Sequence, residues 1–168
     1  MGTFNNQHII NELTESFGSD IYSASEPYGM LTIEINPQKI AQVAEFLFNH
    51  KSLQFTFLTD ICGIHTPDVK DKELGVIYHF HSLINNIRIR VKCFLPDGNA
   101  HLPTISHIFS AANWQERETY DFYGIVFDGH PNLKRILNVD EMEYFPLRKE
   151  YPLEDQTRTD KDDKYFGR

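Results

Sequence analysis

The sequence predicts an α+β domain of two layers, in which helices cover one face of a mixed β-sheet, followed by an extended C-terminal tail. Two segments near the N-terminus repeat apolar side chains at helical spacing. Three later segments alternate apolar and polar residues in the manner of strands. The order of helix, strand, helix, strands and helix favours a sheet with its helices on one face. The 168 residues are enough for about one domain with a hydrophobic core.

The first half of the chain predicts two helices separated by a strand. Residues 8–17 form the first helix, which ends at Gly18 because glycine favours a helix stop. Residues 30–35 alternate as a strand does. Asn36 and Pro37 are typical of an N-cap followed by proline in the first turn, so a second helix runs from there to Phe48.

Three strands are predicted next, over residues 55–64, 74–83 and 87–95. Asn85 and Asn86 suit a tight hairpin turn between the last two, because asparagine tolerates positive φ. In the third strand apolar residues alternate with Arg88, Arg90 and Lys92, which predicts one buried face and one cationic face.

A third helix is predicted from Thr104 to Gly124, with a candidate break at residues 111–113. From about Asp128 onward prolines and dense charge replace this pattern, so residues 128–168 can hardly build a core of their own. Such a segment is either disordered or lies across another protein, and its single apolar residues at short intervals favour the second. We therefore expect an α+β domain over residues 1–127 and an extended segment over residues 128–168.

Composition excludes several classes of function. The net charge of −8 argues against nucleic-acid binding, which needs a basic surface. The sequence has neither a signal peptide nor an apolar run of about 20 residues, so we expect membrane association only through a partner. Cys62 and Cys93 lie far apart and cannot alone hold an iron–sulfur cluster or a structural zinc, so reduced thiols are expected.

Two groups of residues are candidates for chemistry. His79 and His81 would face the same side of a strand, and with His65 they are a candidate metal site. We favour polar-face strand residues instead, because no HExxH motif or carboxylate at matching spacing accompanies them. The sequence contains no GxSxG, GxGxxG or P-loop motif either.

The acids Glu116, Glu118 and Asp121 are candidate acid/base catalysts of an independent enzyme such as a hydrolase. The alternative is an ion-pair network at the end of the helix, in which Arg117 and Asp121 pair four residues apart. We favour the network, and expect no catalytic residue, no cofactor-binding residue and no metal ligand in this chain.

The segment from Glu116 to Leu137 mixes charges with large aromatic residues, which indicates a surface that another protein covers. Its order of residues resembles the signature of the respiratory complex I 30-kilodalton subunit family, the C subunit of bacterial NADH–quinone oxidoreductase. The residues that carry the resemblance are Glu116, Arg117, Glu118, Asp121, Phe122, Tyr123, His130, Lys134, Arg135, Ile136 and Leu137. Residues 145–153 (FPLRKEYPL) are similar to the family's downstream element, the strands agree more loosely, and residues 1–27 add little.

The resemblance implies a subunit of the peripheral arm that carries no flavin, iron–sulfur cluster or quinone, all of which are expected in partner subunits. It implies contact with the large, D-type quinone-site subunit, along which the C-terminal segment would wrap, and with other peripheral-arm subunits. The location implied is the cytoplasmic side of the inner membrane, reached only through the complex. Because the chain ends soon after the downstream element, we expect a free subunit rather than a fused form. An equivalent scaffold subunit of a membrane-bound hydrogenase-type or ferredoxin-linked complex is the alternative.

We expect the interface with the partner to be built from signature residues between Glu116 and Arg135 and from Arg148 of the downstream element. The three acids and Arg117 would form a partly buried charged network, with apolar area from the neighbouring aromatic residues. His130, Lys134 and Arg135 would meet carboxylates or carbonyl groups of the partner, and Arg148 would form a bidentate pair. The expected interface residues are Glu116, Arg117, Glu118, Asp121, Phe122, Tyr123, His130, Lys134, Arg135 and Arg148.

Overall fold

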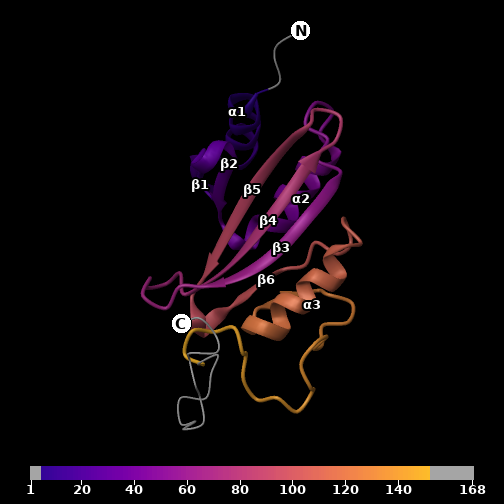
Figure 1. Cartoon of the computed structure of the whole chain (residues 1–168). Coiled ribbons are helices and arrows are strands. Elements are labelled where there is room, and N and C mark those ends of the chain that lie inside the picture. Colours follow the sequence, from indigo (N-terminus) through magenta and orange to yellow (C-terminus); the bar gives the residue numbers. More distant parts are fainter. Residues whose placement is uncertain (1–4, 152–168) are drawn as a thin grey trace, which may run out of the picture.

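The computed structural model describes residues 5–151, and these confirm the α+β class (Figure 1). The strands of the large sheet lie in the order β1-β2-β5-β4-β3, with β2 and β5 parallel and the other neighbours antiparallel, so the sheet is mixed. A short parallel pair, β6 and β7, forms a second sheet. The elements are α1 (Asn6–Phe17), β1 (Ile21–Ser25), β2 (Leu31–Ile35), α2 (Ile40–Asn49), β3 (Phe57–His65), β4 (Leu74–Ser82), β5 (Ile87–Leu95), β6 (His101–Pro103), α3 (Ala112–Tyr123) and β7 (Val126–Asp128).

Gly18 and Asn36 act as the sequence predicts, whereas the N-cap of α1 was not predicted and this helix begins two residues before the expected start. The side chain of Asn5 accepts a hydrogen bond from the backbone N–H of His8 and so caps α1. Gly18 follows the helix with a φ of 51°, a conformation that costs glycine little. The side chain of Asn36 accepts from the N–H of Gln38 at the start of the turn that leads into α2, which confirms the predicted N-cap.

The hairpin of β4 and β5 also follows the sequence pattern. Asn86 in its turn has a φ of 50°. The side chains of Ile89, Val91 and Cys93 on β5 are buried, whereas the arginines and lysine between them stay partly or fully exposed, so the prediction of one buried and one cationic face is confirmed.

One hydrophobic core joins the sheet to the helices. Ile9 and Leu13 of α1 and Leu47 of α2 are fully or almost fully buried against the inward face of the sheet. Phe109 connects the layers, because its ring lies 5.4 Å from that of Phe48 and 5.4 Å from that of Phe80 on β4. The helix α3 packs beside β3, the edge strand of the sheet, and covers that edge.

The third helix starts later than the sequence pattern predicts. The α-helix begins at Ala112, and residues 104–111 form turns instead. Thr104 and Ile105 are held by hydrogen bonds to the carboxylate of Glu116, a contact that a continuous helix through these residues would not allow. The strands β1, β6 and β7 were not predicted, because they are short and either mostly exposed or paired with residues far away in the sequence.

Residues 129–151 contain no helix and no strand, and follow α3 and the nearby end of the sheet (Figure 1). Residues 152–168, which include Pro152 and Leu153 of the downstream element and much of the expected tail, lie outside the described part of the chain. Within residues 5–151, no helix is both long and apolar enough to cross a membrane.

Candidate functional site

Asp121 on α3 is the centre of a hydrogen-bond network that attaches the following segment to the helix. Its carboxylate is fully buried. It accepts hydrogen bonds from the backbone N–H groups of Ile136, Leu137 and Asn138, at 2.8–3.0 Å, and from the Asn138 amide at 3.1 Å. The guanidinium of Arg135 completes the set at 2.8 Å. Asp121 therefore fixes the chain direction at residues 135–138.

The electrostatics of this site favour the charged form of Asp121. Burial alone would raise the pKa of the carboxyl group. The backbone N–H groups and Arg135 outweigh that effect and hold the pKa well below its usual range. Asp121 is thus a carboxylate at every physiological pH, which excludes proton transfer by this residue near neutrality.

Arg117 and Arg135 bind carbonyl groups of the chain itself. Arg117 donates to the carbonyl oxygens of Lys134 and Arg135, and its guanidinium lies 5.1 Å from the centre of the Trp114 ring. Besides Asp121, Arg135 donates to the carbonyl oxygens of Met142 and Tyr144. The predicted pairing of Arg117 with Asp121 is wrong, because Arg117 points to the backbone and Arg135 takes its place as the cation.

Glu116 is the second fully buried carboxyl group, and its surroundings differ from those of Asp121. It accepts hydrogen bonds from the hydroxyl of Thr104 and from the N–H of Ile105. The side chain of His130 is also buried, with Nε2 bonded to the carbonyl oxygen of Asn113, so that nitrogen carries the proton. The Nδ1 of His130 accepts from the N–H of Asn132, so the imidazole is neutral and gives Glu116 no cation. Burial accordingly raises the pKa of Glu116 to about 7.

Replacing Glu116 with glutamine should flatten the pH dependence of stability. An unfolded glutamate titrates near pH 4.3, so the folded chain binds more protons between about pH 4 and 7. The free energy of unfolding of the wild type should therefore fall by about 2–3 kcal/mol as the pH rises through that window. Urea unfolding of wild type and Glu116→Gln from pH 4 to 8 measures this, and parallel profiles would contradict the assignment.

Phe145 and Arg148 attach the end of the described segment. The ring of Phe145 lies 5.1 Å from the guanidinium of Arg135 and 5.2 Å from that of Arg148. Arg148 donates through Nε to the carbonyl oxygen of Tyr123 and through one other nitrogen to Asp97 at 2.7 Å, so it forms an ion pair within the chain and not the expected bidentate pair. The backbone N–H of Lys149 then donates to His65, on the core side of the sheet.

Other signature residues are left at the surface. Glu118 and Lys134 are exposed, and their side chains form neither a hydrogen bond nor an ion pair with any described residue. Phe122 and Tyr123 are half-buried. Glu118, Phe122 and Tyr123 line a pocket between α3 and β3, whereas Glu116 and Asp121 do not. The three acids therefore do not converge as an acid/base pair would.

The histidines do not converge either. His65 lies on the buried face of the sheet, and His79 and His81 lie on the other face. Among the described residues, the group with ligand atoms close enough for a metal is instead Asp60, Cys62 and His79.

The hydrogen bond from Arg90 makes His79 a poor metal ligand. Because an arginine only donates, Nε2 of His79 must be the acceptor, and the proton of the neutral ring sits on Nδ1, the nitrogen that faces Asp60. Burial, with a contribution from Asp60, raises the pKa of the Cys62 thiol to about 11. Both groups are therefore protonated at the atoms that a metal would need.

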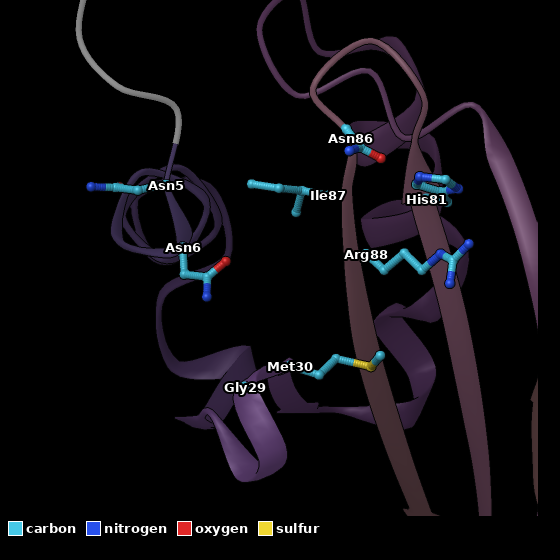
Figure 2. A pocket seen from close by; sticks show the side chains of 8 residues that line it. All are labelled: Asn5, Asn6, Gly29, Met30, His81, Asn86, Ile87 and Arg88. Atoms are coloured by element: carbon cyan, nitrogen blue, oxygen red, sulfur yellow. The ribbon is translucent and has the colours of Figure 1, made fainter.

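A second pocket, of about 640 Å³, lies between the start of α1 and β5 (Figure 2). Figure 2 shows Ile87 pointing from β5 towards Asn6 on α1, with Met30 below it. Arg88 and His81 are its ionisable lining residues, and its described lining contains no carboxylate, so it offers no acid/base pair.

An apolar surface accompanies the charged network. Leu137, Val139 and Trp114 keep 66%, 62% and 61% of their surface exposed, although the neighbouring backbone is held in place. Tyr144, Leu147 and Tyr151 continue the series along the segment. We call these six residues the apolar surface. Large apolar side chains held in fixed positions at the surface are typical of protein–protein contacts.

Several residues of the site cannot be found from the signature pattern. Thr104, Asn138 and Phe145 bind signature side chains, yet the sequence marks Thr104 only as the start of a predicted helix and Phe145 only as an isolated apolar residue. The one signal in the sequence was the number of charged residues next to apolar ones in the signature. Such charges require hydrogen-bond or ion-pair partners, although the sequence does not say which residues these are.

Comparison with known sequences shows which family this chain resembles. The model of the family described as "Respiratory-chain NADH dehydrogenase, 30 Kd subunit" matches residues 33–157. The NADH-quinone oxidoreductase C 2 subunit of Rhizobium meliloti (strain 1021) is 41% identical over 139 residues, which are 82% of this chain and 75% of that protein. The NADH-quinone oxidoreductase C subunit of Streptomyces coelicolor (strain ATCC BAA-471 / A3(2) / M145) is 42% identical over 125 residues, or 74% of this chain, which spans half of that longer protein.

Solved structures with a similar fold include a fragment of Nqo5 and a chain of an archaeal respiratory membrane complex. The trypsin-resistant fragment (1-134) of Nqo5 superposes with a TM-score of 0.63 at 29% identity, over 76% of this chain and 98% of the fragment. A chain of the membrane-bound sulfane sulfur reductase, an archaeal respiratory membrane complex, superposes with a TM-score of 0.73 over 88% of this chain and 85% of its own. Its identity of 21% shows a shared fold alone. The family match and these identities show that the chain belongs to the 30-kilodalton subunit family of the respiratory-chain NADH dehydrogenase.

Proposed function

We propose that this chain is a subunit of a proton-pumping NADH–quinone oxidoreductase, complex I, and that it supports assembly and fixes the position of the quinone-site subunit. The single observation that carries this proposal is the apolar surface. Asp121 and Arg135 hold the backbone at residues 136–138, 142 and 144, so the exposed side chains there need no rearrangement to meet a partner. The relatives named above are subunits of NADH–quinone oxidoreductase, which supports the identity of the complex.

The proposed role uses no redox group bound by this chain. Flavin, iron–sulfur clusters and quinone would belong to partner subunits, and electron transfer there depends on atoms held in fixed positions. The two buried carboxyl groups are used to hold backbone, and the atoms of Cys62 and His79 that would bind a metal carry protons. These features support a structural role.

The proposed partner is the large, D-type quinone-site subunit, with other peripheral-arm subunits around it. The interface would contain the apolar surface together with Glu118, Phe122, Tyr123 and Lys134, which the fold leaves accessible. The remaining signature residues, whose polar atoms are bonded within the chain, would act by shaping that interface. The chain would reach the cytoplasmic side of the inner membrane only through the complex.

A scaffold subunit of another respiratory membrane complex is the second candidate. The fold shared with a chain of the sulfane sulfur reductase favours it, although the sequence relatives favour NADH–quinone oxidoreductase. Purification of the native complex separates the two, because a nickel–iron or sulfur-reducing partner would replace the NADH-oxidising subunits.

Replacing Arg117 with alanine tests the structural role. The variant loses two hydrogen bonds to the backbone of residues 134–135 and the contact with Trp114, so the start of the segment and the Trp114 side chain are held less firmly. We expect the amount of assembled complex to fall by about fivefold or more, with the quinone reductase turnover of each assembled complex nearly unchanged. Native electrophoresis combined with an activity assay measures both quantities.

The matched control is Lys51→Ala, which removes an exposed cation from another part of the fold. It should assemble as the wild type does. Normal assembly of Arg117→Ala with abolished quinone reduction would contradict the structural role and favour direct catalysis.

A further inference from the structure

A small pocket lies between β3 and α3, and the C-terminal segment closes part of it. Its volume is about 210 Å³, enough for one large side chain. Asp60 and Cys62 line it from β3, and Glu118, Phe122 and Tyr123 line it from α3. Leu147 of the C-terminal segment also lines it, so three separate parts of the chain surround one space.

The walls of this pocket are fixed by close packing. A Cβ atom on Gly63 would lie 2.4 Å from the ring of Tyr123, so only glycine on β3 lets this ring approach the strand. The backbone N–H of Leu147 donates to the carbonyl oxygen of Phe122 at 3.2 Å, which fixes Leu147 beside α3. The pocket is therefore formed before any partner binds.

Two carboxylates line this space, and neither forms an ion pair with a lysine or arginine among the described residues. Asp60 accepts a hydrogen bond from the Cys62 thiol at 3.2 Å, and its nearest basic group is Nδ1 of His79 at 3.9 Å. His79 is neutral because it accepts from Arg90, whose strand β5 is two strands away from β3. Glu118 has neither an ion pair nor a hydrogen bond with a described residue.

The other lining residues suit the flat faces and apolar stem of a guanidinium side chain. Phe122 and Tyr123 offer aromatic rings, which attract cations and stack on planar groups. Leu147, with 43% of its surface exposed, offers apolar area to the methylene groups of such a side chain. An ammonium group would gain less, because it is compact and more strongly hydrated.

We propose that this pocket receives an arginine side chain of a partner subunit, with its guanidinium between Asp60 and Glu118 and its stem against the aromatic rings and Leu147. The inference rests on the proposed function, since the arginine must come from another subunit of the complex. It also explains a difference within the signature. Glu116 and Asp121 are buried to hold the fold, whereas Glu118 on the same helix is exposed and makes no ion pair with a described residue.

The experiment measures association of purified variants with the rest of the complex after this subunit has been removed. The variants are Glu118→Gln and Asp60→Asn, which remove one charge each, Glu118→Asp, which keeps it, and Glu118→Met, which makes the site apolar. Glu45→Gln is the matched control, because Glu45 is an exposed glutamate on α2. The thermal midpoint of each isolated variant establishes that it folds.

Glu118→Gln, Glu118→Met and Asp60→Asn should each weaken association by about tenfold or more, whereas Glu118→Asp recovers most of the loss and Glu45→Gln has no effect. Association of the wild type should also fall more steeply with salt than that of Glu118→Gln. Wild-type association by Glu118→Gln would overturn the proposal. Association of Glu118→Met at or above the wild-type level would overturn it in favour of an apolar occupant. Failure of the wild-type chain to associate at all would instead refute the proposed function.

Discussion

Replacing Asp121 with alanine should lower the free energy of unfolding of the isolated chain by about 3–5 kcal/mol. The substitution leaves Arg135 without its buried counter-ion and leaves three backbone N–H groups of residues 136–138 without their acceptor. Urea unfolding of the two chains at pH 7 measures the difference. The matched control is Asp140→Ala, since Asp140 is exposed and makes no such bonds with residues 5–151, and its effect should be below about 0.5 kcal/mol.

This difference should depend on pH in a defined direction. The pKa of Asp121 is lower in the folded chain than in the unfolded chain, where an aspartate titrates near pH 3.9. Its contribution to stability is therefore complete above about pH 5 and is lost as the pH falls below 4 towards the folded pKa. The stability difference between wild type and Asp121→Ala should therefore shrink steadily as the pH falls from about 4 to 2, and a constant difference across that range would contradict the hydrogen-bonded carboxylate.

Replacing Gly124 with alanine should be the second most damaging change, with a loss of about 2–4 kcal/mol. Gly124 ends α3 with a φ of 75°, a conformation that alanine adopts at a cost. Its new Cβ atom would also lie 2.4 Å from the ring of Phe145, so this ring would have to leave its place between Arg135 and Arg148. The thermal midpoint and the near-ultraviolet circular dichroism of the aromatic residues measure both consequences.

Gly98→Ala is the control for this substitution. Gly98 lies in a turn without positive φ, and its Cβ would meet no atom within 4 Å. Its stability should stay within about 0.5 kcal/mol of the wild type. If Gly124→Ala is equally mild, then the ring of Phe145 does not pack on the end of α3.

The sequence was sufficient for the parts of the fold that local patterns determine. The two N-terminal helices, the strand between them and the hairpin of β4 and β5 follow from hydrophobic periodicity and from single residues such as Asn36 and Asn86. The start of α3 could not be predicted in this way. The hydrogen bonds of Glu116 to Thr104 and Ile105 form only in the tertiary structure, and the sequence pattern has no signal for them.

The signature residues were expected at a partner interface, which stays a prediction, and their contacts within the chain were predicted only in part. Charged side chains that are buried next to aromatic ones are expected to be paired, and Asp121 and Arg135 follow this rule, whereas the exposed Glu118 and Lys134 form no ion pair with a described residue. This rule cannot tell whether the pair forms within the chain or across an interface. The helical spacing suggested Arg117 as the partner of Asp121, but a residue fourteen positions downstream makes the bond, because the chain turns back along α3. Local spacing does not specify such a return.

The proposed structural role depends on one property of the chain, that the signature holds residues 134–138 against α3 in the absence of any partner. Hydrogen exchange of the backbone amides in the isolated chain tests it most directly. The N–H groups of Leu137 and Asn138 should exchange at least about a hundredfold more slowly than in an unstructured peptide, and Asp121→Ala should abolish that protection. Exchange of both amides at the unstructured rate in the wild type would contradict this property, and would mean that only the assembled complex fixes the segment.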